Sequence, residues 1–386
     1  MTPAVVALIG PGLVGSAVLG QLAAPALSPL FRVVAVASSR HAVLVSSPTD
    51  SAALAARDFT TAPLATHPSA RPLTSLVDVV AHLQATASAA GGVPAIVVDC
   101  TAHDGVAAHY AAWLAAGTHI VTPNKRGFAG DVSQYAAIKA AARIPTGTSN
   151  SPTAGLLFHE STVGAGLPLL STIADLVDTG DQITSIEGVF SGTLSYLFNE
   201  FSTAALAAPS EPFSSIVTKA KALGYTEPDP RDDLNGMDVA RKVVILARAA
   251  GLSLSLQDVR VHNIVPSALR DVPDASAFLA GLPAYDAEMA ALHTSAHASG
   301  AVLRYVGSVD VTTGTAKVDL VPCQGGHPLA GLRGADNLVL IKSKRFARGL
   351  VIQGAGAGDD VTAFGVTSDL LKVVRTASYV PPALGQ

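Results

Sequence analysis

Aromatic and charged residues are both scarce in this chain of 386 residues. Phe, Trp and Tyr make up 5% of the residues and Asp, Glu, Lys and Arg 14%, whereas apolar residues reach 49%. The core must therefore be built from Ala, Val, Leu and Ile, which suits helices packed on a buried parallel sheet. The length favours two domains over a single core.

Three further absences narrow the class of protein. The two cysteines, Cys100 and Cys323, match neither a disulfide framework nor a zinc spacing, so we expect two buried thiols. The formal net charge of −4, without any run of Lys and Arg, argues against nucleic acid and membrane surfaces as partners and favours small molecules. No apolar stretch approaches the roughly 20 residues that cross a bilayer, and no basic leader precedes the first apolar run. We therefore expect a cytoplasmic protein.

A glycine fingerprint follows the first apolar run. Residues 4–9 predict a buried strand, and Gly10-x-Gly12-x-x-Gly15 then leads into a helix, with a second strand at residues 32–37. In this context Gly10 permits the tight turn, Gly12 lets a pyrophosphate approach the backbone, and Gly15 lets helix and strand pack closely. The alternative is a purely structural glycine turn, which the strand and helix on either side make the weaker interpretation.

The end of the second strand bears on the choice of cofactor. An NAD-preferring site usually has Asp or Glu there to bind the ribose 2′-hydroxyl. This chain has Ser38-Ser-Arg40-His41 instead. The guanidinium of Arg40 suits a 2′-phosphate, which favours NADP(H) over the alternative NAD(H). An exposed arginine without any ligand is the other interpretation.

Changes in pattern along the chain divide it into three parts. We predict an α/β fold, with a Rossmann-type doubly wound nucleotide-binding domain over residues 1–150 and an α+β catalytic domain with a mixed or antiparallel sheet over residues 151–349. Residues 350–386 are expected to return to the nucleotide-binding domain. Residues 41–72 read as loops with a short helix, and residues 271–300 are rich in Ala and Ser without a clear element.

Charge is concentrated between Glu227 and Lys242, ahead of an apolar helical run. Asp238 and Lys242 share one helix face, and a surface ion pair between them would be worth only about 0.3 to 0.5 kcal/mol. Because the helix continues as Val-Val-Ile-Leu-Ala, its charges are costly unless they are used. The functional interpretation places Asp238 and Lys242 in a cleft, where Lys242 moves a proton at a substrate oxygen and Glu227 takes an ammonium group.

Two other segments carry candidate polar groups. Lys125 ends the strand Thr122-Pro-Asn-Lys on the carboxyl side of the predicted sheet, where open α/β folds bind ligands. If it approached Lys242, the pKa of one of the two lysines would fall. The segment 160–168, with one carboxylate among small residues, reads from its residues alone as an ordinary glycine-rich loop.

Taken in order, five segments resemble the homoserine dehydrogenase family. The motifs Arg-Asp-Asp-Leu-Asn-Gly and Asp-Val-Ala-Arg-Lys are most similar to those of its fungal-type, single-function members. The resemblance implies no regulatory domain and no kinase half. The matching segments are the N-terminal fingerprint, Thr122–Lys125, Glu160–Pro168, Gly224–Lys242, and His327-Pro-Leu-Ala with Gly354–Gly358.

The resemblance implies reversible NADP(H)-dependent reduction of L-aspartate 4-semialdehyde to L-homoserine, in threonine, methionine and isoleucine biosynthesis. It makes Lys242 the catalytic acid/base and Lys125 a second group at the reacting oxygen, near the nicotinamide. It also implies a homodimer formed through the sheet of the second domain. The substrate residues it implies are Glu227, Asp238, Asp233, Gly192 and Thr193. The cofactor contacts it adds are Leu13, Val14, Thr101 and Gly358. The ligands it implies for a monovalent cation, usually sodium, are Glu160, Val163, Ala165 and Leu167.

Two other functions were weighed against this one. Aspartate-semialdehyde dehydrogenase handles the same aldehyde but needs a cysteine nucleophile, and neither Cys100 nor Cys323 has a suitable setting. A non-catalytic NADP-binding protein would have no need for the lysines and carboxylates at positions 125, 227, 238 and 242.

Overall fold

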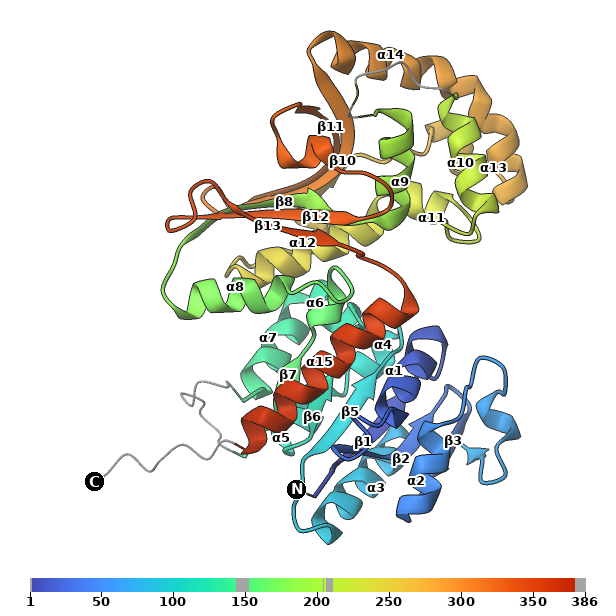
Figure 1. Ribbon diagram of the computed structural model, residues 1–386, viewed down its shortest axis with the longest axis vertical. Helices are drawn as coiled ribbons and strands as arrows, with labels where there is room; N and C mark the ends of the chain where they lie inside the picture. The colour runs from blue at the N-terminus through green and yellow to red at the C-terminus, as the bar shows by residue number, and fades with distance from the viewer. Residues whose placement is uncertain (1, 144–152, 204, 206–210, 379–386) are drawn as a thin grey trace. The chain divides into compact units, whose positions relative to one another are not determined.

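The computed structural model describes residues 2–143, 153–203, 205 and 211–378, and the chain divides into two compact units (Figure 1). The first unit comprises Met1–Gly166 with Gly358–Gln386, and the second comprises Leu167–Ala357. A first unit with a mainly parallel α/β sheet and a second unit with a mixed α+β sheet agree with the predicted fold class.

The first unit is built on a seven-stranded sheet in the order β4-β3-β2-β1-β5-β6-β7. The strands β2, β1, β5, β6 and β7 run parallel, and β1 and β5 are apolar and almost entirely buried because helices cover both faces. The strands are β1 (Ala4–Ile9), β2 (Phe31–Ala37), β3 (His41–Leu44), β4 (Arg71–Pro72), β5 (Ala95–Asp99), β6 (His119–Val121) and β7 (Leu157–Phe158).

Helices from both ends of the chain complete this unit. They are α1 (Leu13–Ala23), α2 (Pro48–Ala55), η1 (Leu64–Thr66), α3 (Leu76–Ala89), α4 (Asp104–Ala107), α5 (Tyr110–Ala115), α6 (Arg126–Ala129), α7 (Val132–Ala141), η2 (Glu160–Thr162) and α15 (Asp359–Ser378). Four apolar residues of α15, from Ala363 to Val373, belong to the same core as β1 and β2. Gln21 of α1 donates to Asp360 at 3.0 Å and accepts from Thr367 at 2.8 Å. The last helix is thus an integral layer of the first unit (Figure 1).

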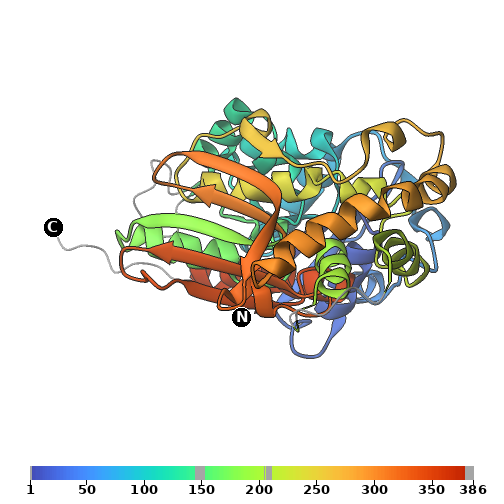
Figure 2. The ribbon, with the colours of Figure 1, turned by 90° about the horizontal axis from the view of Figure 1, so that it is seen from above.

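The second unit is built on a six-stranded mixed sheet in the order β13-β12-β8-β10-β11-β9. All neighbours are antiparallel except β11 and β9, and β10 and β11 form a long hairpin, orange in Figure 2. The strands are β8 (Ile183–Val189), β9 (Val259–Val261), β10 (Ala301–Asp310), β11 (Thr315–Gln324), β12 (Asn337–Ser343) and β13 (Leu350–Gly354).

The helix α12 packs on β10 and β11 of this sheet. Its residues from Val243 to Ala247 are all buried, which agrees with the apolar run that predicted a buried helix. The helices of the unit are α8 (Leu169–Asp178), α9 (Gly192–Phe201), α10 (Phe213–Ala222), α11 (Arg231–Leu234), α12 (Met237–Ala249), η3 (Leu256–Asp258), η4 (Ser267–Leu269), α13 (Ala275–Gly281), η5 (Leu282–Tyr285), α14 (Asp286–Ala298) and η6 (Pro328–Gly331).

Arg304 of β10 is fully buried and ties α9 to η6. Its guanidinium donates to the carbonyls of Phe198 and Ser202 at the C-terminal end of α9, and to those of Leu329 and Ala330. A cation at a helix C-terminus satisfies carbonyls that lack an intrahelical partner. Burial nevertheless lowers the pKa of Arg304 to about 10. The residue therefore fixes α9, whose N-terminal end begins at Gly192.

Several boundaries differ from the prediction. The predicted boundary at residue 150 lies outside the described residues, and β7 still pairs with β6 in the first sheet, so the first unit continues to Gly166. The return was predicted at residue 350, but β13 pairs with β12 in the second sheet and the chain re-enters the first unit only at Gly358. Residues 41–72 contain the edge strand β4 and its neighbour β3, and residues 271–300 are mainly helical. Among the described residues, no helix has both the length and the hydropathy to cross a membrane.

Candidate active site

The glycine fingerprint forms the turn between β1 and α1. Gly10 has φ +87°, and a Cβ atom there would lie 2.7 Å from Cγ2 of Thr101. At Gly15 a Cβ atom would lie 2.2 Å from the carbonyl oxygen of Gly10, so both positions need glycine for the fold itself. Gly12 is different, since a Cβ atom there would meet nothing within 4 Å. The space beside Gly12 is open, as a site for a pyrophosphate requires.

The other predicted cofactor residues of the first unit lie at ends of elements. Leu13 and Val14 begin α1, where the leading backbone N–H groups have no partner in the helix, and Leu13 is 67% exposed. Gly358 is exposed, has φ +107° and directly precedes α15. Arg40 is exposed in the turn from β2 to β3, where the hydroxyl of Ser38 accepts from its backbone N–H at 3.3 Å. The turn holds the backbone of Arg40 and leaves the guanidinium in solvent.

Thr101 and Lys125 follow the neighbouring strands β5 and β6. Thr101 donates its backbone N–H to Asp99 at 2.8 Å. The carbonyl of Lys125 accepts from the N–H groups of Phe128 and Ala129, which begins α6 directly after the lysine. Because β1, β5 and β6 are parallel, Gly10, Thr101 and Lys125 all come at carboxyl ends of strands on one edge of the sheet.

Sequence reasoning did not single out Asp99, which is fully buried at the end of β5. Its carboxylate accepts from the hydroxyl of Tyr110 at 2.5 Å and from the amide of Asn124 at 2.9 Å. Burial is the main reason why the pKa of Tyr110 lies well above its usual value, followed by the charge of Asp99. The sequence feature that could have identified this residue is an acidic side chain at the end of an otherwise apolar strand.

In the second unit, Lys242 reaches from α12 to the end of β8. Its ammonium donates to the carbonyl of Phe190 at 2.8 Å and lies 2.8 Å from Oδ2 of Asp238, with 11% of the side chain exposed. The ion pair that was weighed as the alternative interpretation is therefore present, but the lysine side chain is largely buried and also bonds to backbone. It differs in this respect from the weak surface pair considered as the alternative.

The predicted pocket residues Gly192, Thr193, Asp233 and Glu227 come together beside this lysine's anchor. Gly192 and Thr193 begin α9 two residues after Phe190. The hydroxyl of Thr193 lies 2.9 Å from Oδ1 of Asp233, and the backbone N–H of Glu227 donates to Oδ2 at 2.8 Å. Burial raises the pKa of Asp233. The carboxylate of Glu227 itself is exposed, so it is available to an ammonium group of a ligand.

A second pair in this segment, Asp229 and Arg231, holds the loop in shape. Nε of Arg231 donates to Asp229 at 3.0 Å, and Nη1 donates to the carbonyl of Val272 at 2.7 Å. The hydrogen bond from Arg231 lowers the pKa of Asp229. The dense charge between Glu227 and Lys242 thus divides into a pair that holds the loop and a second group that contains Glu227, Asp233, Asp238 and Lys242.

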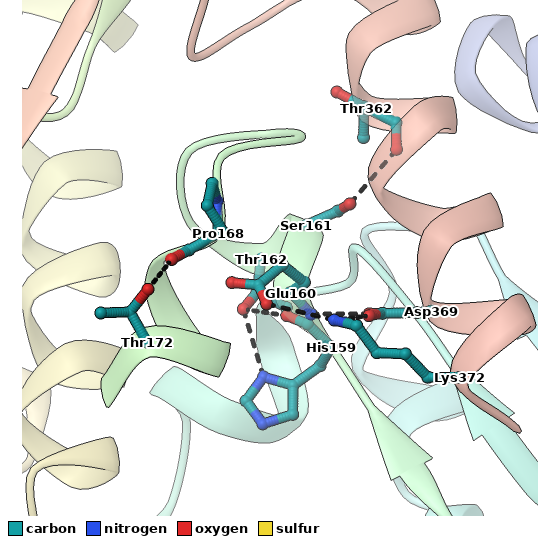
Figure 3. Close-up of polar contacts among 9 residues, drawn as sticks. All are labelled: His159, Glu160, Ser161, Thr162, Pro168, Thr172, Thr362, Asp369 and Lys372. Carbon is teal, nitrogen blue, oxygen red and sulfur yellow. Dashed lines mark hydrogen bonds and ion pairs between the residues drawn. The ribbon is translucent and has the colours of Figure 1, made fainter. Parts of the chain in front are cut away.

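The predicted cation loop packs against α15 within the first unit (Figure 3). The ammonium of Lys372 lies 2.8 Å from Asp369 and 3.4 Å from Oε2 of Glu160, and the backbone N–H of Glu160 donates to Asp369 at 2.9 Å. Burial raises the pKa of Asp369 to about 6, although the charge of Lys372 opposes this. The Glu160 carboxylate is thus engaged by an ammonium from the last helix.

The loop after Glu160 turns sharply. Gly164 has φ +77° and Ala165 has φ +55°. Within the part of the chain that the structure describes, no hydrogen bond reaches the carbonyl oxygens of Val163 and Ala165, although both residues are buried. No cluster of three His, Cys, Asp or Glu side chains among the described residues could hold a metal. Leu167, the fourth predicted ligand, is the first residue of the second unit. The available donors are backbone oxygens, which suit a hard cation.

Comparisons with known proteins cover the whole chain. A family model described as homoserine dehydrogenase matches residues 168–371, and one described as homoserine dehydrogenase, NAD binding domain, matches residues 10–146. Homoserine dehydrogenase of Emericella nidulans is 44% identical over 381 residues, which cover 97% of this chain and 99% of that protein. The Saccharomyces cerevisiae enzyme is 41% identical over 378 residues, with 96% and 98% covered.

The chain belongs to the homoserine dehydrogenase family. As a homoserine dehydrogenase it is an oxidoreductase, which confirms the predicted activity and leaves neither alternative function supported. A crystal structure of a Candida auris protein of unknown function has 40% identity and a TM-score of 0.84, covering 97% of this chain and 99% of that one. A hyperthermophilic archaeal homoserine dehydrogenase in complex with NADPH, at 20% identity and TM-score 0.68, shows the same fold and covers 97% and 98%.

The thiols of this homoserine dehydrogenase are unsuited to act as nucleophiles. Cys323 is buried, and Cys100 follows β5 against the turn at Gly10. Burial raises the pKa of Cys323 to about 11 and raises that of Cys100 further. A nucleophilic cysteine needs the thiolate, which both environments disfavour. The expected burial holds for Cys323, whereas Cys100 is only partly buried.

The open space at Gly12 gives a first testable prediction. Gly12→Ala should leave the thermal unfolding midpoint unchanged, because the new methyl group meets no protein atom, but should weaken NADPH binding by tenfold or more, about 1.4 kcal/mol, by obstructing the pyrophosphate. Gly15→Ala is the matched control and should instead lower the midpoint through its clash with Gly10. Calorimetry and cofactor titration measure both effects, and unaltered NADPH affinity in Gly12→Ala would remove the fingerprint from the cofactor site.

Proposed function

We propose that this chain reduces L-aspartate 4-semialdehyde reversibly to L-homoserine with NADPH as donor, and that Lys242 is the acid/base. The observation that carries the proposal is the placement of Lys242, a largely buried ammonium fixed by Phe190 and Asp238 in a member of this family. When bound, NADPH supplies a hydride to the aldehyde carbon. One proton must then reach the aldehyde oxygen, so that aldehyde, NADPH and a proton give alcohol and NADP⁺.

The residues around Lys242 can divide this work. Lys242 donates the proton to the new alkoxide oxygen and takes it back in the reverse reaction. Asp238 and the carbonyl of Phe190 orient the ammonium. The exposed carboxylate of Glu227 suits the α-ammonium of the amino acid, with Gly192, Thr193 and Asp233 shaping the pocket. Lys125, at the carboxyl end of β6 in the first unit, is proposed as the second group at the reacting oxygen.

Two substitutions at one position test the role of Lys242. Lys242→Ala should lower kcat by roughly 100- to 10,000-fold while leaving the Kd of NADPH unchanged, because the cofactor residues lie in the first unit. Lys242→Arg can keep the ion pair with Asp238 but stays protonated at neutral pH, so it should be nearly as inactive. Steady-state kinetics with homoserine and with aspartate semialdehyde measure this. Wild-type turnover in Lys242→Arg would mean that the ion pair, and no proton transfer, is what matters.

Arg40 is proposed to select NADPH over NADH. Its guanidinium is exposed at the end of β2, where a 2′-phosphate would need a cation. Arg40→Ala should raise the KM of NADPH about tenfold or more, equal to about 1.4 kcal/mol, and leave that of NADH unchanged. Arg260→Ala, at an exposed arginine of the second unit, is the charge-matched control and should alter neither value. Equal effects of Arg40→Ala on both cofactors would refute the selection.

We further propose that a monovalent cation, sodium by the resemblance, binds the loop through Glu160, Val163, Ala165 and Leu167. Support comes from the buried carbonyls of Val163 and Ala165, which receive no hydrogen bond within the described residues. Such oxygens are costly to bury without a partner. A bound cation would therefore stabilise the turn and the helix α15 that packs on it.

Removal of the cation is expected to lower stability. The unfolding midpoint of the protein dialysed into choline chloride should rise when sodium chloride replaces it at equal ionic strength. Because ionic strength is constant, screening of surface charges cannot account for the shift. Identical midpoints in the two salts would count against the cation site. The homodimer and the cytosolic compartment stay predictions.

A further inference from the structure

The carboxylate of Asp99 is a junction between segments that the function uses. It is fully buried, and a buried carboxylate is stable only where donors replace its water. One oxygen accepts from the backbone N–H of Thr101 at 2.8 Å. The other accepts from Tyr110 at 2.5 Å and from Nδ2 of Asn124 at 2.9 Å. The first oxygen faces the cofactor residue Thr101, and the second faces the segment that carries Lys125.

Asn124, which is 1% exposed, uses both ends of its amide at this junction. Nδ2 donates to Asp99 and also lies 3.2 Å from the carbonyl of His103. Oδ1 accepts from the backbone N–H of Arg126 at 3.0 Å. Lys125 therefore lies between Asn124, which is bonded to Asp99 at the end of β5, and Arg126, whose backbone N–H is bonded to Asn124. The backbone of Lys125 cannot shift without breaking one of these bonds.

The same junction reaches the glycine turn. Thr101, held by Asp99, is the residue whose Cγ2 would lie 2.7 Å from a Cβ atom at Gly10. A displacement of the carboxylate would therefore move Thr101 against the turn that precedes α1. The carboxylate of Asp99 thus helps to fix the positions of Gly10, Thr101 and Lys125 at the carboxyl edge of the sheet.

We propose that Asn124, together with Asp99, is a positioning pair that sets the backbone of Lys125 for the reaction. This inference rests on the proposed function of Lys125 and adds two residues that touch neither substrate nor cofactor. Tyr110 donates to the same carboxylate from α5, and its hydroxyl also lies 3.1 Å from Oγ1 of Thr122, but it does not cap the backbone N–H of Arg126 as Asn124 does. The pair and Tyr110 can therefore be separated experimentally.

The test compares Asn124 with Tyr110. Asn124→Ala should lower kcat about 10- to 100-fold, since small misplacements of a catalytic group cost on that order. The Kd of NADPH should change by a smaller factor, because Thr101 keeps its own hydrogen bond to Asp99. The deuterium isotope effect on kcat with 4-deuterated NADPH should rise, because hydride transfer becomes slower than product release. Tyr110→Phe removes another donor from the same carboxylate and should lower the unfolding midpoint without changing kcat or the isotope effect.

Two further variants keep the test decisive. Asn124→Ser can retain a cap on the N–H of Arg126 but cannot reach Asp99, so it should fold and still show the loss in kcat. The exchange Asp99→Asn with Asn124→Asp restores a hydrogen bond in the reverse sense and should recover about tenfold of the kcat lost in Asp99→Asn alone.

The outcomes separate this inference from the function on which it rests. Wild-type kcat in folded Asn124→Ser, or an equal loss of kcat in Tyr110→Phe, would overturn the positioning pair. Lys125→Ala is measured alongside. If it is inactive while Asn124→Ser is active, only the positioning pair fails. If Lys125→Ala retains full turnover, the proposed role of Lys125 itself fails.

Discussion

The cost of burying a charge governs where this charge-poor chain places its polar side chains. A buried ion is stable only where several hydrogen-bonding groups converge on it. Asp99 has three donors, Arg304 has the carbonyls of a helix end and of η6, and Lys242 has a carbonyl and a carboxylate. Each of these sites forms where one element ends and another begins. The buried charges therefore hold together the places where structural elements meet in both units.

Parallel pairing concentrates the predicted cofactor residues of the first unit at one edge of its sheet. The chain passes from β1 to β2 on one side and later to β5 on the other, and open α/β folds bind their ligands at such a reversal of strand order. Gly10 follows β1 and Thr101 follows β5. In the second unit, the segment from Phe190 to Thr193 brings polar residues together. The carbonyl of Phe190 accepts from Lys242, and the hydroxyl of Thr193 contacts Asp233.

Local sequence patterns predicted much of this arrangement. The apolar run and glycines of residues 4–15 encode strand, turn and helix within one contiguous stretch, and the spacing of Asp238 and Lys242 was enough to place both on one helix face. These patterns and the resemblance predicted the fold class and the family, and the matches to family models confirmed the family.

Features that depend on distant partners were not predicted. Asp99 and Asn124 are 25 residues apart, and nothing in either segment alone indicates their hydrogen bond. The pairing of β13 with β12 placed the second boundary at residue 357, although the glycines after Leu350 suggested an earlier return. The strands β3 and β4 were missed because they are short, with four and two residues, and both residues of the edge strand β4 are exposed.

The place of α15 in the core of the first unit has a consequence for synthesis in the cell. A ribosome releases β1 to β7 long before it makes Leu370 and Val373, which fill the same core. During that interval the parallel sheet has an uncovered apolar surface, while all of the second unit is being translated. The core of the nucleotide-binding unit therefore stays incomplete until nearly the whole polypeptide has been synthesised. Slow elongation would lengthen its exposure to chaperones and to aggregation.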